Sequence, residues 1–181
     1  FKNNDRIMGT AATKYVNKNL LSYNANRKVR IRFSLMPQVL SDKLEPSTSK
    51  IIDRIKAIND FYDAGYDVHI NYSPIIIYEN HVEDYRKLFQ LIDKYVRDDI
   101  KEYVKAESIF LTHNVKLHDY NVNNNVEGEE LLWNPFLQEK KVSQYGGNNL
   151  RYKYKDKRDY INNFVSVHDS IIPWQEIRYI F

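Results

Sequence analysis

The sequence predicts an α/β fold: half of a partial parallel (β/α) barrel, followed by a C-terminal β-hairpin and helix extension. Along residues 1–113 the hydrophobic period alternates between two and about 3.6, in the order strand, helix, strand. Gly-Gly-Asn-Asn at 146–149 is flanked by strand-like segments and predicts a hairpin. We expect residues 1–113 to form the C-terminal part of the barrel and residues 114–181 a hairpin-containing extension of the same domain.

The first repeat unit comprises two strands and the segment between them. Apolar and polar residues alternate from Val29 to Ser34, which is typical of a strand, and Pro37 ends the run. Residues 10–13 lead into a helix-like run over 16–23, which completes a β-α-β pattern. Lys14 and Ser34 then stand at the carboxyl ends of neighbouring parallel strands, where ligands bind in folds of this class.

The next units repeat this pattern. Hydroxyl residues at 47–49 are good N-caps for a helix over 51–62, and Gly65 suits its C-terminal end. A strand over 68–72 follows, which we expect Ser73-Pro74 to break.

Beyond this point the sequence predicts one more helix and strand of the parallel layer, and then the extension. The expected elements are a helix over 82–96, a buried strand over 108–112, a loop over 121–128, a helical turn over 129–132, hairpin strands over 142–145 and 150–154, a helix from Asp156, and a short strand over 176–181.

Composition sets broad limits on function. The 181 residues, 43% of them hydrophobic, suffice for one domain with a real core, and a net charge of +3 permits nucleic-acid binding without requiring it. With no cysteine, these residues provide no disulfide, thiolate ligand or cysteine nucleophile. No apolar run approaches the roughly 20 residues that span a bilayer, so we expect a soluble, cytoplasmic protein with no membrane partner.

Three strand-end residues are candidate ligand contacts. Lys14 and Ser34 together offer an ammonium and a hydroxyl, which suit a carboxylate or a phosphate. Ser73 at the end of the next strand could contact a flat ligand. Ordinary strand ends, and a proline kink at Ser73-Pro74, are the alternative interpretations, and the residues alone leave both open.

Two histidines and an aspartate after the strand predicted over 108–112 are candidate metal ligands. His113, His118 and Asp119 carry suitable groups, because imidazole and carboxylate bind zinc or iron. No pair has metal-binding spacing on a clearly predicted element. We therefore expect no metal site among these residues.

A basic and aromatic stretch surrounds the Gly-Gly turn and is typical of a hairpin that holds phosphates and stacks on bases. A solvated hairpin with tyrosines on its packed face is the alternative. The stretch comprises Lys140, Lys141, Gln144, Tyr145, Arg151, Tyr152, Lys153, Tyr154, Lys155, Lys157 and Arg158, on both sides of Gly146-Gly147.

A series of motifs resembles the C-terminal half of the spore photoproduct lyase family, and their order and spacing match with almost no gaps from Lys14 to Phe89. The motifs are Thr13-Lys14-Tyr15, Arg30-Ile31-Arg32-Phe33-Ser34, Leu44-Glu45-Pro46-Ser47-Thr48-Ser49, Ala64-Gly65-Tyr66, Ser73-Pro74-Ile75, Glu79, Tyr85-Arg86-Lys87-Leu88-Phe89 and Gln144-Tyr145-Gly146.

The resemblance implies a radical S-adenosylmethionine (AdoMet) lyase with a partial barrel, which repairs a thymine dimer of spore DNA by hydrogen abstraction. By resemblance, Lys14 and Ser34 match positions that hold the carboxylate and amino end of AdoMet, and Ser73 matches a small residue beside its adenine. Tyr145 matches the catalytic hairpin tip that inserts into damaged double-stranded DNA. The neighbouring substrate contacts would be Gln144, Gly146, Gly147, Lys140, Lys141, Arg151 and Lys153.

The chain also departs from the family pattern. The CxxxCxxC motif for a [4Fe-4S] cluster lies N-terminal to anything present here, so we expect an N-terminal cluster-binding segment as partner and no activity from this chain alone. Met36 replaces a usual Asn, and Gln144 replaces an Arg. A radical AdoMet enzyme with another substrate, or a non-catalytic nucleic-acid-binding module, therefore remains an alternative.

Overall fold

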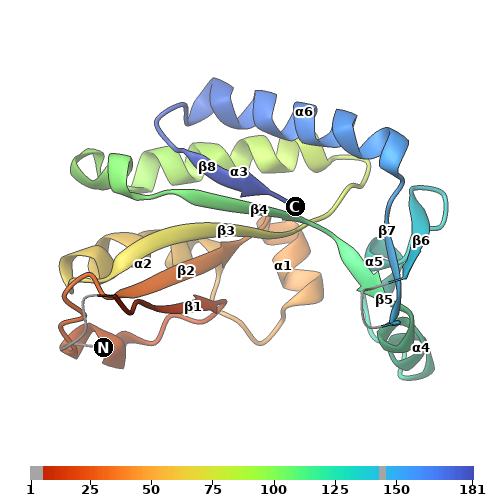
Figure 1. The fold of residues 1–181 in the computed structure, drawn as a ribbon, viewed down its shortest axis with the longest axis horizontal. Coiled ribbons are helices and arrows are strands. Elements are labelled where there is room, and N and C mark those ends of the chain that lie inside the picture. Colours follow the sequence, from red (N-terminus) through yellow and green to blue (C-terminus); the bar gives the residue numbers. More distant parts are fainter. Residues whose placement is uncertain (1–5, 143–145) are drawn as a thin grey trace.

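The computed structural model describes residues 6–142 and 146–181, which form two sheets (Figure 1). The main sheet is five-stranded and wholly parallel, and the small sheet is three-stranded and antiparallel, which confirms the predicted α/β class with a hairpin extension. In spatial order the main sheet contains β1 (Gly9–Thr13), β2 (Val29–Leu35), β3 (Asp67–Ile75), β4 (Ala106–Phe110) and β8 (Ile177–Ile180). The small sheet contains β5 (Thr112–Asn114), β7 (Asn148–Tyr152) and β6 (Gln138–Val142).

Helices connect and cover the strands. They are α1 (Gln38–Leu44), α2 (Ile51–Asp63), α3 (His81–Tyr95), α4 (Val115–Asn123), α5 (Glu129–Leu132) and α6 (Tyr154–Ile171), with short 3-10 helices η1 (Lys18–Ser22) and η2 (Asp98–Tyr103). The long helices α3 and α6 pack side by side (Figure 1). Within the described residues, no helix combines the length and apolar character needed to cross a membrane.

The two faces of the main sheet differ in character. Alternate residues such as Phe33 and Ile70 are fully buried in the apolar core with the helices. The residues between them point to the other face, which is polar and carries Arg32, His69 and Glu107. Period-two alternation in β2 and β3 therefore separates a structural face from a polar face.

Some predicted elements near the N-terminus differ in the structure. The run over 16–23 forms only the five-residue 3-10 helix η1, capped by Asn17, whose Oδ1 accepts a hydrogen bond from Asn19 N at 3.1 Å. Short segments of this length are often 3-10 helices, which close hydrogen bonds three residues apart. Ser73-Pro74 does not end β3: the strand continues to Ile75 through a cis peptide bond, with a register shift in its pairing to β4.

The predicted N-cap of α2 was also wrong. Its cap residue is Lys50, and Gln38 Oε1 instead accepts a hydrogen bond from Ile51 N at 2.8 Å. Ser49 Oγ is used elsewhere, because it accepts a hydrogen bond from Val16 N at 2.9 Å. Ser49 therefore connects its loop to the segment after β1 rather than capping the helix. The predicted helix end is confirmed, since Gly65 follows the cap with φ +86°.

The extension is more helical than predicted. Helix α4 begins at Val115 and includes part of the predicted loop, because Asn114 Oδ1 caps it by accepting hydrogen bonds from Lys116 N and Leu117 N. The hairpin strands β6 and β7 begin and end earlier than predicted, since Tyr154 already starts α6. Residues 143–145 of the predicted strand lie outside the described part of the chain.

Candidate functional site

Lys14, Ser34 and Ser73 lie at one edge of the main sheet. Lys14 directly follows β1, and Ser34 and Ser73 are near the carboxyl ends of β2 and β3. Because the three strands are adjacent and parallel, their carboxyl ends meet at the same edge. The main-sheet strands run toward the end of the molecule where the small sheet lies (Figure 1). We call this edge the strand-end rim.

Glu45 positions the ammonium group of Lys14. The Lys14 Nζ atom lies 2.6 Å from Glu45 Oε1, and the Glu45 side chain is only 5% exposed. The Lys14 side chain keeps 42% of its surface exposed, so a ligand can reach it while the ion pair persists. A fixed, accessible cation suits a carboxylate or a phosphate.

The buried guanidinium group of Arg54 bonds to residues of the strand-end rim from inside the protein. Arg54 on α2 is fully buried, and its Nη1 donates to the backbone oxygen of Ser34 at 2.9 Å. Its Nη2 lies 3.0 Å from Glu45 Oε2. Its other acceptors are Ser49 O, Ser41 Oγ and Thr48 Oγ1. Every Arg54 nitrogen thus has an acceptor, as a buried charge requires.

The position of Arg54 on an otherwise apolar helix face is a sequence signal for its structural role. The buried face of α2 also includes Ile51, Ile55 and Ile58, and a charged residue on such a face must find partners inside the protein. Arg54 therefore connects two parts of the chain, the segment 45–49 and the carboxyl end of β2.

Glu107 organises the polar face of the main sheet. Its Oε2 atom lies 2.6 Å from Arg32 Nη1 and accepts a hydrogen bond from the Tyr179 hydroxyl at 2.6 Å. Burial alone would raise the pKa of Glu107, but the hydrogen bonds from Tyr179 and Arg32 lower it below its usual value. Glu107 therefore remains ionised and ties β4 to β2 and β8.

Some polar atoms on this face have no partner within the described residues. They are Asn71 Oδ1, His69 Nδ1 and Arg32 Nε, all of them buried. Asn71 is the register partner of Ser34 on the neighbouring strand, so its free acceptor lies beside the rim. Buried polar groups are nearly always hydrogen-bonded, so these atoms are candidates for contact with a ligand or water.

The basic residues predicted to contact DNA differ in whether they already bond to other groups of the protein. Lys140 and Lys141 are exposed on β6, whereas Arg151 Nη2 pairs with Glu139 at 3.0 Å. Lys153 Nζ donates to the carbonyl of Phe136 at 2.6 Å. Lys140 and Lys141 are thus the better candidates for phosphate contacts.

The hairpin turn is described only in part. Gln144 and Tyr145 lie outside the described residues, whereas Gly146 and Gly147 lie within them. Gly146 has φ +77°, a conformation that favours glycine, and a Cβ atom there would meet nothing within 4 Å. The turn is therefore glycine-dependent through its backbone.

A shallow basic hollow of about 680 Å³ lies on the first turns of α6 and is lined by Tyr154, Lys155, Lys157, Arg158 and Ile161. Tyr154 is 79% exposed. Burial lowers the pKa of Lys157, and the nearby positive charges of Arg151 and Lys141 lower it further. The local potential is therefore positive, which favours an anion.

Tyr152 joins the small sheet to the main sheet. Its buried hydroxyl accepts a hydrogen bond from Ile77 N, 2.8 Å away, in the segment that follows β3. Burial raises the pKa of Tyr152, so the hydroxyl stays neutral. The hairpin and the rim thus belong to one connected structure.

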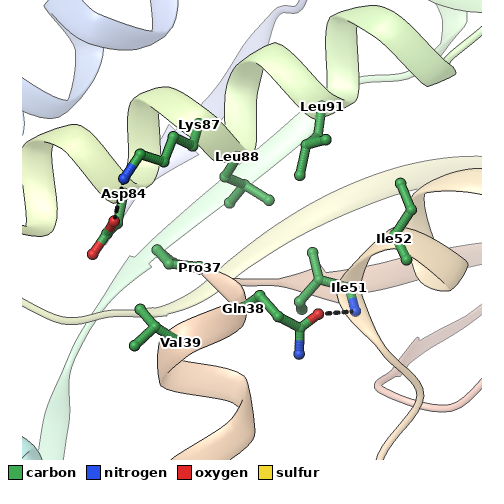
Figure 2. A pocket seen from close by; sticks show the side chains of 9 residues that line it. All are labelled: Pro37, Gln38, Val39, Ile51, Ile52, Asp84, Lys87, Leu88 and Leu91. Carbon is green, nitrogen blue, oxygen red and sulfur yellow. Dashed lines mark hydrogen bonds and ion pairs between the residues drawn. The ribbon is translucent and has the colours of Figure 1, made fainter.

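A separate apolar hollow of about 360 Å³ lies between α1, α2 and α3 (Figure 2). Its polar groups already have partners: Gln38 bonds to Ile51 N, and Lys87 pairs with Asp84. It offers neither the charge nor the hydroxyls of the rim, so we assign it no role in the function.

The two candidate histidine ligands lie together, but around a carboxylate other than Asp119. His113 and His118 both contact Glu129, and Asp119 is exposed outside this group. Glu129 was missed because it lies 16 residues from His113 in the sequence.

Together, the parallel five-stranded sheet, its polar strand-end rim and the basic hairpin define an α/β protein with a candidate ligand site at its strand ends. A sequence model described as "Spore photoproduct lyase" matches residues 4–181. The chain therefore belongs to the spore photoproduct lyase family.

Individual relatives agree with this assignment. Spore photoproduct lyase of Bacillus subtilis (strain 168) is 34% identical over 90 residues, which cover 50% of this chain and 26% of the relative. A solved structure of a spore photoproduct lyase double mutant with bound AdoMet and dinucleoside spore photoproduct has a TM-score of 0.88 at 21% identity, covering 98% of this chain and 52% of that one. A single mutant with dinucleoside spore photoproduct gives 0.87 at 21% identity, covering 98% and 53%. The chain thus spans about half the length of these solved structures, and they support the fold.

Proposed function

We propose that this chain is the AdoMet- and lesion-binding half of a radical AdoMet DNA repair lyase, which reverses a thymine dimer by hydrogen abstraction. The observation that carries the proposal is the position of Lys14, Ser34 and Ser73 at the ends of three adjacent strands, at the end of the molecule that carries the basic hairpin. Family membership supports the same reaction class.

The rim groups fit the polar end of AdoMet. The Lys14 ammonium would bind its carboxylate, while Asn71 Oδ1 and the Ser34 hydroxyl can accept hydrogen bonds from its amino group. Ser73 would lie beside the adenine. Bound AdoMet supplies the radical chemistry, and the residues of this chain bind it, orient it and keep water away.

The [4Fe-4S] cluster needs ligands that these residues do not provide. The chain has no cysteine, and cysteine thiolates are the usual ligands of such clusters. An N-terminal cluster-binding segment is therefore the proposed partner, and the chain alone would be inactive. A CxxxCxxC motif in the coding sequence upstream of Phe1 would support this arrangement.

The hairpin would bind damaged double-stranded DNA in the cytoplasm. Lys140 and Lys141 would neutralise phosphates, and Tyr145 would stack beside the lesion. Tyr145→Ala should weaken binding to lesion-bearing duplex by about 1 to 3 kcal/mol, the range for one stacked base. Equal affinity for damaged and intact duplex in both proteins would contradict lesion recognition by Tyr145.

AdoMet binding by the protein joined to its cluster-binding segment tests the rim. Lys14→Met should lower AdoMet affinity by roughly 10- to 150-fold, because hydrogen bonds to charged groups contribute about 1.5–3 kcal/mol. The control Lys94→Met removes an exposed lysine on α3 and should change nothing. Unchanged AdoMet affinity in Lys14→Met would refute the rim assignment.

Two other outcomes would indicate the alternative functions. AdoMet cleavage without repair of a dinucleotide lesion would indicate an enzyme with another substrate, and DNA binding without AdoMet binding would indicate a non-catalytic module.

A further inference from the structure

Three potential metal ligands converge on β5, α4 and α5, elements other than those that carry Lys14, Ser34 and Ser73. His113 Nε2 lies 2.9 Å from Glu129 Oε1, and His118 Nδ1 lies 2.5 Å from the same oxygen. The three ligand atoms all lie within 4.8 Å of one another. His113 and Glu129 are buried, and the His118 side chain is 21% exposed, so the group is largely shielded but reachable from solvent.

Each side chain comes from a different element, which is why the sequence spacing gave no metal signal. His113 lies on β5, His118 on α4, and Glu129 is the first residue of α5. Asn114 caps α4 and so fixes the direction in which that helix leaves β5. Gly128, with φ +85°, turns the chain into α5. The local fold thus aims three side chains at one point.

Neighbouring residues hold two of these side chains in place. Asn121 Nδ2 donates to Glu129 Oε2 at 2.6 Å, which leaves Oε1 directed at the histidines. The His118 ring stacks on Trp133 with centroids 3.7 Å apart and planes 5° apart. Metal sites typically have such outer partners, which orient the ligands.

The donor atoms of the three side chains suit a cation, since Glu129 offers a carboxyl oxygen and each histidine offers a ring nitrogen. Two imidazoles and one carboxylate form the ligand set of several zinc sites that keep a fourth position open.

We propose that His113, His118 and Glu129 bind a divalent transition-metal ion of the zinc class, with water in the fourth position. Ions of this class bind imidazole nitrogen as well as carboxylate oxygen. Mg²⁺ and Ca²⁺ instead take oxygen ligands. In a tetrahedral site with bonds of about 2.0–2.2 Å, ligand atoms are separated by roughly 3.3 Å. Each nitrogen would therefore move outward from Glu129 Oε1 by less than 1 Å, and the two nitrogens, which lie within 4.8 Å of each other, would move to a similar separation.

The metal ion would stabilise the elements on which the hairpin packs. His113 is the register partner of Leu150 on β7, so the ion would clamp β5, and through it β7, to α4 and α5. This role is independent of AdoMet and of lesion repair. It predicts a gain in stability, since binding to the folded state alone stabilises that state.

Titration of the 181-residue protein with Zn²⁺ or Co²⁺ tests the proposal, and its lack of cysteine removes thiolates as competing ligands. We expect one ion per chain, visible absorption typical of four-coordinate Co²⁺, and a thermal midpoint that rises with Zn²⁺. Asn121→Ala should weaken affinity about 10- to 100-fold, as removal of an outer partner does. His118→Phe keeps the ring against Trp133 but removes the nitrogen, and should weaken affinity further.

The matched control is His81→Ala, which removes a histidine on α3 outside the cluster. It should bind both ions like the unchanged protein. Circular dichroism would establish that each variant is folded. The proposal is overturned if the unchanged, folded protein neither binds Co²⁺ nor gains stability from Zn²⁺. It is also overturned if folded His118→Phe and Asn121→Ala both bind with unchanged affinity, because the ions would then bind elsewhere.

Discussion

The guanidinium of Arg54 donates a hydrogen bond to the backbone oxygen of Ser34, with Nη1 and the oxygen 2.9 Å apart. The same side chain contacts Glu45, which in turn pairs with Lys14. The two rim residues are therefore supported by one buried network, although 20 residues separate them in the sequence.

Arg54→Ala should destabilise the fold strongly. The substitution removes the partner of the buried Glu45 carboxylate and opens a cavity, and breaking a buried ion pair costs about 3–5 kcal/mol. Urea unfolding followed by circular dichroism measures the loss. Arg86→Ala is the control, because Arg86 forms an exposed pair with Glu83 at 3.4 Å, and such pairs contribute about 0–1 kcal/mol. Similar small losses in both variants would contradict the structural role of Arg54.

Tyr152→Phe should weaken the joint between the two sheets. It leaves the buried Ile77 N–H without its acceptor, and an unsatisfied buried donor costs about 1–3 kcal/mol. The measurement is again the free energy of unfolding. Tyr160→Phe removes a hydroxyl that has no hydrogen-bond partner among the described residues and should cost little. If the two variants were equally stable, the hydrogen bond would not contribute to the joint.

Because of Glu107, the free energy of unfolding should fall as the pH becomes acidic. Its folded-state pKa is lowered below the usual 4.5, so its contribution is fully present above that value and is lost as the pH falls through the folded-state pKa. Glu107→Gln should therefore flatten the fall in unfolding free energy below pH 4.5. Glu127→Gln, an exposed control, should keep the full acid dependence. If Glu107→Gln left the slope of the unfolding free energy against pH unchanged, other carboxyl groups would be responsible for the acid dependence.

The double substitution Lys140→Ala/Lys141→Ala should reduce the salt dependence of duplex binding. Each lost phosphate contact lowers the slope of log affinity against log salt by about 0.9, so the pair should lower it by roughly 1.8. Fluorescence anisotropy across a salt series measures this. Lys56→Ala/Lys94→Ala removes the same charge from α2 and α3 and should leave the slope intact. Equal slopes in all three proteins would place the DNA elsewhere.

Hydrophobic period and turn residues predicted most of the strands and helices, because period directly reflects which side of an element is buried. Parallel order also predicted that Lys14 and Ser34 share an edge. What could not be predicted depends on contacts across the chain: the choice of Glu45 and Arg54 as supports, and of Glu129 rather than Asp119 as the partner of His113. Helix α4 was missed because its exposed residues have little apolar pattern, although Asn114 was a visible cap.

Strand β8 pairs with β4, with Ala106 opposite Ile177 and Ser108 opposite Ile180. During synthesis, the ribosome must therefore release about 70 further residues after β4 before this side of the sheet can close. Until then β4 presents an open, largely apolar edge to other nascent chains. A premature stop codon shortly before Ile177 would spare every rim residue and yet yield a chain prone to aggregation.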